Sequence, residues 1–323
     1  MSELDSPHPP AAIAAGPPSP ATPSLTLPRL RGREGWGQGE GRGQDEGDNV
    51  SGTAEIGFAA RDGATHLSHL YQRHPMRVLF PTPELGDARL AVLVTTSGGL
   101  VAGDRVSVAI RLDSGAVAHV TASAAEKIYR STGATTEIAQ SLSVAAAGWL
   151  EYLPPETILF DGARLRRHTT IAFTPGAGFL CGGILVFGRR ARGESFTHGL
   201  MHEEWRVSRD GVLSWGDALH LDGDIAATMA DPACFDRAAA CATLILAPPA
   251  GDPRGFVDGA RAVQQQSLSP GLRGGVTAVG GLVVARWLAA EPLTLRRAFA
   301  DLACHFRQAA MGLPARLPRL WHV

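Results

Sequence analysis

The sequence predicts a mainly β fold, built from stacked β layers and carrying two or three helices mostly toward the C-terminal half. Three observations predict this fold class. Apolar and polar residues alternate from about residue 53, turns containing glycine separate the alternating runs, and helical periodicity appears only late in the chain. With 323 residues, 45% of them hydrophobic, the chain can bury a sizeable core.

The alternation is clearest in residues 105–112, RVSVAIRL, and in residues 136–144, TEIAQSLSV. Every second side chain would lie on one face of a strand, and that face is apolar apart from Gln140. The turns between such runs contain Gly115, Gly148, Gly176 and Gly211. Glycine can adopt positive φ in these turns, and the spacing of roughly 30 residues suggests stacked layers.

Three segments predict helices. Residues 231–247 are rich in alanine, and Asp231 could serve as N-cap with Pro232 at the first helical position. Residues 291–314 place four apolar side chains on one helical face: Leu295, Phe299, Leu302 and Phe306. Residues 252–266 are a weaker candidate.

Residues 1–50 are expected to form a disordered segment, because proline and glycine deny them both a core and regular hydrogen bonding. Residues 51–323 are expected to form a single β-rich domain. The chain begins without an apolar segment typical of a secretory signal, and no apolar run reaches the length of a membrane span. A cytoplasmic protein without a membrane partner is therefore expected.

Composition also narrows the possible partners and metal sites. A net charge of -1 argues against a general nucleic-acid-binding protein. The four cysteines lack the CxxC spacing of a zinc site or a redox pair. We therefore expect them to be buried small apolar residues in a protein of a reducing compartment. Cys234 and Cys241 would share one face of the helix predicted for residues 231–247.

Two glycine- or charge-rich segments stand out in the first half of the chain. In TTSGGLVAGD, residues 95–104, the order of glycines is not that of a phosphate loop, and Asp104 is expected to cap a tight turn. AAEKIYRS, residues 124–131, contains Glu126, Lys127, Tyr129 and Arg130. Lys127 is the only lysine in the chain, so the sequence contains no Walker A motif.

A third segment, residues 153–167, LPPETILFDGARLRR, contains Glu156, Asp161 and Arg164. Paired carboxylates can act in general acid and base catalysis. One hypothesis is therefore a small β-fold hydrolase or lyase that uses Glu126, Lys127, Glu156 and Asp161. The chain has no GxSxG elbow, HExxH motif or cysteine–histidine cluster to support it, and a charged network that orders a loop is the alternative.

These three segments, with GRRARGE at residues 188–194 and LPARLPRLW at residues 313–321, resemble in order the hallmark segments of the UreD (UreH) urease accessory protein family. The resemblance covers Thr53 to Trp321. It implies a β-helix-like or stacked-β scaffold that is not an enzyme. It further implies a hetero-oligomer in which the chain binds apo-urease and UreF, UreF recruits the GTPase UreG, and nickel passes to the urease active site.

The resemblance also implies an internal polar tunnel through which a nickel ion passes, with no tightly bound cofactor and no tight metal site. The candidate residues for the tunnel, or for the network that holds it open, are Asp104, Glu126, Lys127, Tyr129, Arg130, Glu156, Asp161 and Arg164.

Two features of these segments raise particular questions. The ammonium of Lys127 could neutralise a buried carboxylate beside a cation route, where the wider guanidinium of arginine would not fit. The alternative is a lysine that survived an arginine-rich composition by chance. Gly182 and Gly183 stand where the family pattern has a large aromatic residue and an acid, so this chain would need other groups there.

Overall fold

The computed structural model describes residues 50–267 and 269–322. The predicted disordered segment 1–50 lies outside the described residues except for Val50. The N–H of Val50 donates to Oδ1 of Asp104 at 2.9 Å, which connects the start of the first strand to the TTSGGLVAGD segment.

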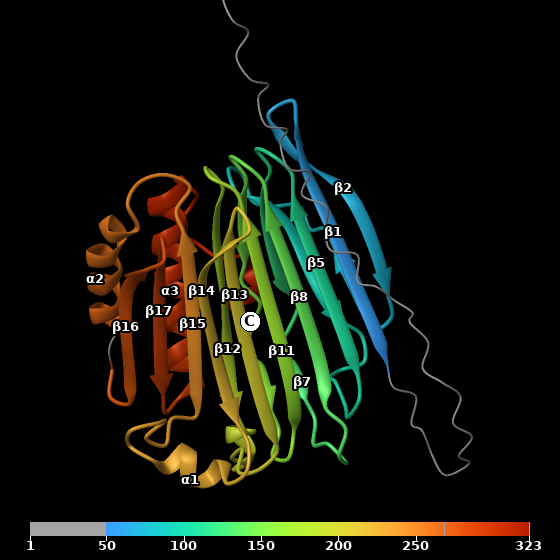
Figure 1. The fold of residues 1–323 in the computed structure, drawn as a ribbon, viewed down its shortest axis with the longest axis vertical. Helices are drawn as coiled ribbons and strands as arrows, with labels where there is room; N and C mark the ends of the chain where they lie inside the picture. The colour runs from blue at the N-terminus through green and yellow to red at the C-terminus, as the bar shows by residue number, and fades with distance from the viewer. Residues whose placement is uncertain (1–49, 268, 323) are drawn as a thin grey trace, which may run out of the picture. The chain divides into compact units, whose positions relative to one another are not determined.

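Two β-sheets form the framework of the fold (Figure 1). The seven-stranded sheet has the spatial order β14-β13-β11-β8-β5-β1-β2. Its strands are β1 (Ser51–Arg61), β2 (Ala64–Arg73), β5 (Arg105–Leu112), β8 (Thr136–Val144), β11 (Arg164–Phe173), β13 (Leu200–Arg209) and β14 (Val212–Leu221).

The ten-stranded sheet lies against it and has the main order β16-β17-β15-β12-β9-β6-β4-β3, with two short strands, β10 and β7, paired beside β12. Its strands are β3 (Met76–Leu79), β4 (Arg89–Thr95), β6 (Val117–Ala122), β7 (Glu126–Ile128), β9 (Trp149–Tyr152), β10 (Thr157–Leu159), β12 (Gly178–Phe187), β15 (Ala240–Ala247), β16 (Leu272–Val279) and β17 (Leu282–Ala289).

The middle of the chain winds between the two sheets like the coils of a solenoid. Strands β5, β8, β11 and β13 are parallel neighbours in one sheet, and β4, β6, β9 and β12 are parallel neighbours in the other. The first set begins at residues 105, 136, 164 and 200, which matches the spacing of the turn glycines. The predicted fold of stacked β layers is confirmed.

Three of the four turn glycines have the expected positive φ, at 73° for Gly115, 76° for Gly176 and 78° for Gly211. Gly148 does not. Ala147 has the positive φ of that turn, at 56°, and Gly148 is needed for space, since a Cβ there would lie 2.8 Å from the carbonyl oxygen of Ala145.

The α-helices of the described residues all lie in the C-terminal half: α1 (Ile225–Ala230), α2 (Val257–Ser267) and α3 (Pro292–Met311). Short 3₁₀ turns occur at η1 (Arg190–Arg192), η2 (Pro253–Phe256) and η3 (Arg319–His322). The predicted helices at 291–314 and 252–266 are confirmed as α3 and as η2 followed by α2.

The predicted helix at 231–247 is wrong. Asp231 is the C-cap of α1, not an N-cap, and residues 240–247 form β15 in the interior of the ten-stranded sheet. A short apolar run buried on both faces has no periodicity that separates strand from helix, and pairing with β12 and β17 overrides the helix propensity of alanine. Cys234 and Cys241 therefore share no helix face, and Cys234 is exposed.

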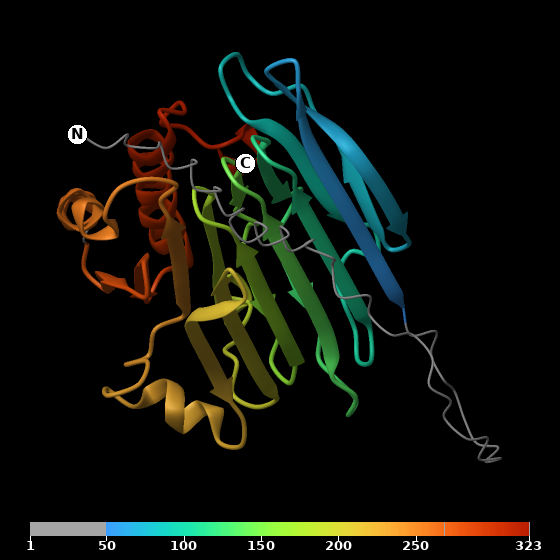
Figure 2. The same ribbon diagram turned by 45° about the horizontal axis from the view of Figure 1, so that its top comes forward.

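Two apolar cores hold the layers together. The first lies between the sheets and contains residues such as Ile110 from one sheet and Val120 from the other. The second lies between the ten-stranded sheet and helices α2 and α3 (Figure 2). It includes Phe299 and Phe306 of α3, which are fully buried. The described residues include no helix long and apolar enough to cross a membrane.

Candidate functional site: a polar cluster between the sheets

A buried ion pair interrupts the apolar core between the sheets. Arg167 of β11 and Glu203 of β13 are register partners on adjacent parallel strands and are 6% and 7% exposed. Arg167 Nε and Nη2 both donate to Oε1 of Glu203, at 2.8 and 2.5 Å, and Nη1 donates to Oγ1 of Thr157 at 2.7 Å. These hydrogen bonds compensate for the desolvation of both charges.

Glu126 lies next to this pair, because β7 pairs with β10 and places Glu126 beside Thr157. The hydroxyl of Thr95 donates to Oε2 of Glu126 at 2.6 Å. Burial raises the pKa of Glu126 above its usual value, although the hydrogen bond from Thr95 and the charge of Arg167 act in the opposite direction. Burial therefore disfavours the charged form of Glu126, and its two neighbours only partly offset that effect.

A chain of neutral hydrogen bonds continues the polar region. Gln140 Nε2 donates to the hydroxyl of Tyr152 at 2.7 Å, and the hydroxyl of Thr169 donates to Oε1 of Gln140 at 2.8 Å. Burial raises the pKa of Tyr152, so this hydroxyl stays protonated. The inter-sheet polar cluster is defined here as Thr95, Glu126, Gln140, Tyr152, Thr157, Arg167, Thr169 and Glu203.

A cleft leads from the molecular surface toward this cluster. A cavity of about 440 Å³ is lined by residues of β14, β15 and β17, including Asp217, Thr243 and Arg286. A second cavity of about 40 Å³ shares Asp217 and Thr243 with it and is lined on its inner side by Gly183 and Glu203. The smaller cavity can hold a water molecule or a small ion. Glu203 is thus the point where the cluster meets the cleft.

A second buried network lies behind the ten-stranded sheet. Glu151 of β9 is 0% exposed and receives hydrogen bonds from Nδ1 of His119 at 2.6 Å and from Nη2 of Arg307 at 3.0 Å. Arg307 of α3 also donates to Oδ1 of Asp87 at 2.5 Å. Burial alone would raise the pKa of Glu151, but the hydrogen bond and charge of His119 and the charge of Arg307 lower it. This network anchors α3 to the sheet.

The structure brings only one of the predicted site residues, Glu126, into the inter-sheet polar cluster. Asp104 caps the turn as expected, accepting from the N–H groups of Val50 and Val101, both at 2.9 Å. Glu156 points toward α3, where Nη1 of Arg296 lies 3.4 Å from its Oε1.

The remaining candidate site residues lie around the loop that contains Asp161. Oδ1 of Asp161 accepts from the N–H of Thr197 at 2.7 Å, and Arg130 lies 3.8 Å from Oδ2 of Asp161. The ring of Tyr129 packs edge-on against Phe160 at a centroid distance of 4.9 Å. Arg164 is half-buried, and its Nε has no hydrogen-bond partner among the described residues.

The side chain of Lys127 is exposed and forms no ion pair with a described residue, although its charge, like that of Arg167, lowers the pKa of Glu126. No direct contact supports the expectation that Lys127 neutralises a buried acid. Strand β7 alternates, so the inward position falls to Glu126 and the outward one to Lys127. The cation that accompanies the buried carboxylates is Arg167.

The TTSGGLVAGD and AAEKIYRS segments pack directly on one another. The N–H of Leu100 donates to the carbonyl of Lys127 at 2.8 Å. A Cβ at Gly99 would lie 2.5 Å from the ring of Tyr129 and 2.9 Å from the carbonyl oxygen of Lys127, so only glycine fits there. The loop thereby positions Thr95 against Glu126.

The two glycines of β12 are explained by their neighbours. A Cβ at Gly182 would lie 2.7 Å from Cζ of Phe299, so the aromatic ring at this place comes from α3. Gly183 faces the other side of the sheet, where the built Cβ would lie 3.7 Å from Nη2 of Arg167 and 4.0 Å from Oε1 of Glu203. The carboxylate near this position therefore comes from β13.

Comparison with known proteins gives one consistent result. The family model for the UreD urease accessory protein matches residues 50–322. The urease accessory protein UreD of Magnetococcus marinus is 39% identical over 279 residues, which cover 85% of this chain and 94% of that protein. The urease accessory protein UreD of a Methylobacterium strain is 43% identical over 261 residues, covering 80% of this chain and 89% of that protein. The chain belongs to the UreD family of urease accessory proteins.

Proposed function

We propose that this protein is a cytoplasmic scaffold that binds apo-urease and UreF, and through UreF the GTPase UreG, for GTP-dependent insertion of nickel into urease. It catalyses no turnover of its own in this proposal. Membership of the UreD family over residues 50–322 is the observation that supports the role in urease maturation.

The inter-sheet polar cluster supports the passage of nickel through the molecule. Divalent cations are bound by carboxylate and other oxygen atoms, and the cluster offers Glu126 and Glu203 with the hydroxyls of Thr95 and Thr157. The cluster holds two carboxyl groups and one guanidinium, that of Arg167, so it has oxygen ligands to offer beyond the single ion pair. A cation entering by the cleft at Asp217 would meet Glu203 first.

The alternative of a hydrolase or lyase finds no support in the geometry. Each of its four residues has a different environment: Glu126 contacts Thr95, Glu156 contacts Arg296, Asp161 contacts Thr197, and Lys127 is exposed. General acid and base groups must converge on one substrate. These residues do not converge.

The test is the variant Glu126→Gln, whose amide oxygen can still accept from Thr95. Burial penalises the charge at this position, so removing the charge should not unfold the protein. Glu137→Gln is the matched control, since Glu137 is half exposed and its ion pair among the described residues is with Arg105, on the outer face of the same domain.

The measurement is urease activity and nickel content after co-expression of each variant with urease and the other accessory proteins, normalised to the complex recovered. We expect Glu126→Gln to lower nickel content severalfold and Glu137→Gln to leave it unchanged. Normal nickel loading with Glu126→Gln would contradict a route through the cluster. Failure of the chain to co-purify with UreF or apo-urease would contradict the scaffold itself.

A further inference from the structure

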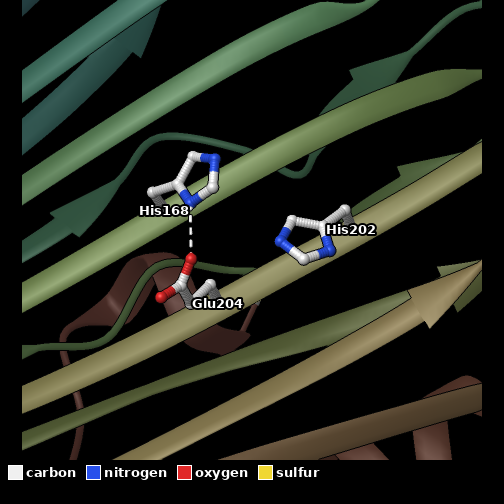
Figure 3. Close-up of side chains that lie close together, drawn as sticks. All are labelled: His168, His202 and Glu204. Atoms are coloured by element: carbon white, nitrogen blue, oxygen red, sulfur yellow. Dashed lines mark hydrogen bonds and ion pairs between the residues drawn. The ribbon is translucent and has the colours of Figure 1, made fainter.

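Histidines gather on the outward face of the seven-stranded sheet, on three neighbouring strands. His168 comes from β11, His202 and Glu204 from β13, and His220 from β14. The register places His168 beside Glu204 and His202 beside His220. Figure 3 shows His168 and Glu204 in contact, with the ring of His202 beside them.

The side chains are close enough to share one ion. Nδ1 of His168 lies 3.0 Å from Oε2 of Glu204, and Nδ1 of His202 lies 3.3 Å from Nδ1 of His220. One potential ligand atom from each of His168, His202 and Glu204 lies within 4.8 Å of the other two. Ligand atoms around a metal with bonds of about 2.0–2.1 Å are separated by roughly 3–3.5 Å, so small side-chain rotations would suffice.

Neighbouring side chains orient two of the potential ligands. Nη1 of Arg206 donates to Oε1 of Glu204 at 3.2 Å, which leaves Oε2 facing Nδ1 of His168 at 3.0 Å. His220 packs beside His202, with a distance of 5.4 Å between the two ring centroids.

Most histidine–carboxylate pairs on a sheet surface are ordinary polar contacts, and this protein contains one for comparison. His69 of β2 lies 3.1 Å from Oε2 of Glu55 of β1, also exposed and on the same sheet. Among the described residues, only the group of His168, His202 and Glu204 combines three potential ligand atoms within metal-binding reach. The additional histidines therefore distinguish this group from the pair on β1 and β2.

We propose that His168, His202 and Glu204 form a surface site for a divalent first-row transition metal, with His220 positioning His202 and water completing the coordination. Imidazole and carboxylate ligands together favour nickel, copper or zinc over magnesium or calcium. The site lies on the opposite face of β11 and β13 from Arg167 and Glu203, so it is separate from the inter-sheet polar cluster. The identification of nickel as the physiological ion rests on the proposed function. The presence of a metal site rests on the geometry of the three side chains alone.

The test is nickel binding by the full chain, measured by equilibrium dialysis at neutral pH. The variants are His168→Ala/His202→Ala and Glu204→Gln, and His69→Ala is the matched control because it removes one histidine from the comparable pair. We expect the double variant to lose one nickel-binding site per chain or to weaken it at least about tenfold. Glu204→Gln should weaken it less, and His69→Ala should bind like the wild type.

Cobalt substitution gives an independent readout, since imidazole coordination changes the visible absorption of Co²⁺ in the wild type and should not in the double variant. Magnesium should not compete with nickel. Equal nickel binding by the wild type and the double variant, with equal thermal unfolding midpoints, would overturn the inference. If the double variant loses the site while urease activation persists, the site stands and is not required for maturation. If the wild type binds nickel here but supports no urease maturation, the proposed function fails and the site remains.

Discussion

Arg307 should be essential to the attachment of α3, and the size of its contribution can be worked out from its contacts. Its side chain is 0% exposed and donates to Glu151, Asp87 and the carbonyl of Arg316. The substitution Arg307→Met keeps most of the apolar stem and removes the charge. Glu151, itself 0% exposed, would then lose its permanent cationic partner and retain only His119 and Trp149.

Removing one member of a buried ion pair typically costs about 3–5 kcal/mol, because the remaining charge stays desolvated. For a domain of this size, each kcal/mol lowers the thermal midpoint by about 2–4 °C. Arg307→Met should therefore lower the midpoint by roughly 6–20 °C. The control Arg105→Ala removes a pair whose side chains are 73% and 50% exposed, and should cost less than about 1 kcal/mol.

The assays are thermal unfolding and urea unfolding of the full chain, both followed by circular dichroism, with Glu151→Gln and the double variant completing a thermodynamic cycle. If Arg307→Met destabilises the protein because it leaves the charge of Glu151 uncompensated, the substitution should cost less when Glu151 is already Gln. We expect the two costs to differ by at least about 1 kcal/mol. Strictly additive losses would refute the electrostatic argument and assign the effect to packing. A loss no greater than that of Arg105→Ala would refute the importance of the network altogether.

Three further outcomes are expected. Gly182→Ala should cost about 1–3 kcal/mol in urea unfolding because its methyl would collide with Phe299, whereas Gly183→Ala, with its nearest neighbour at 3.6 Å, should be tolerated; equal effects would contradict this. Both Lys127→Arg and Lys127→Ala should unfold within about 0.5 kcal/mol of the wild type, since the side chain is exposed; a loss of several kcal/mol would restore a buried role. The pKa of Glu151 is lowered in the folded state, so this carboxylate stabilises the fold above its unfolded pKa of about 4.5, and the stabilisation is lost as the pH falls through the folded pKa. Glu151→Gln should therefore reduce the loss of stability at acidic pH. An unchanged loss of stability at acidic pH would exclude Glu151 as its source.

The sequence was informative wherever a pattern repeated along the chain. Alternation identified β5 and β8, and the amphipathic pattern of residues 291–314 identified α3. It failed at residues 231–247, where the strand is central in its sheet and buried on both faces. There the conformation is decided by partners that are distant in sequence, and local propensity points to the wrong structure.

The candidate site was predicted less well, for a related reason. The family resemblance directed attention to segments with many charges, but most of those charges lie outside the inter-sheet polar cluster: Asp104 caps a turn, Glu156 faces α3, and Lys127 and Arg130 are exposed. Arg167 and Glu203 were missed although they carry a readable signal: each is a charged residue at an inward position of an alternating strand. That signal requires the phase of the strand to be known, because Arg166 and Glu204 are adjacent in sequence and face outward.

Strands β11 and β13 show why it matters for function which of their residues face inward and which face outward. On β11 and β13, the inward Arg167–Glu203 pair alternates with the outward His168 and Glu204. A slip of one residue in either strand would turn one member of the ion pair outward and one histidine inward, and would leave the other charge buried without its partner. A buried ion pair contributes little net stability compared with apolar residues, but two charges that are direct register partners penalise every other pairing of these strands. The pair therefore fixes the register of β11 against β13, and with it both the polar cluster inside the molecule and the histidine cluster outside.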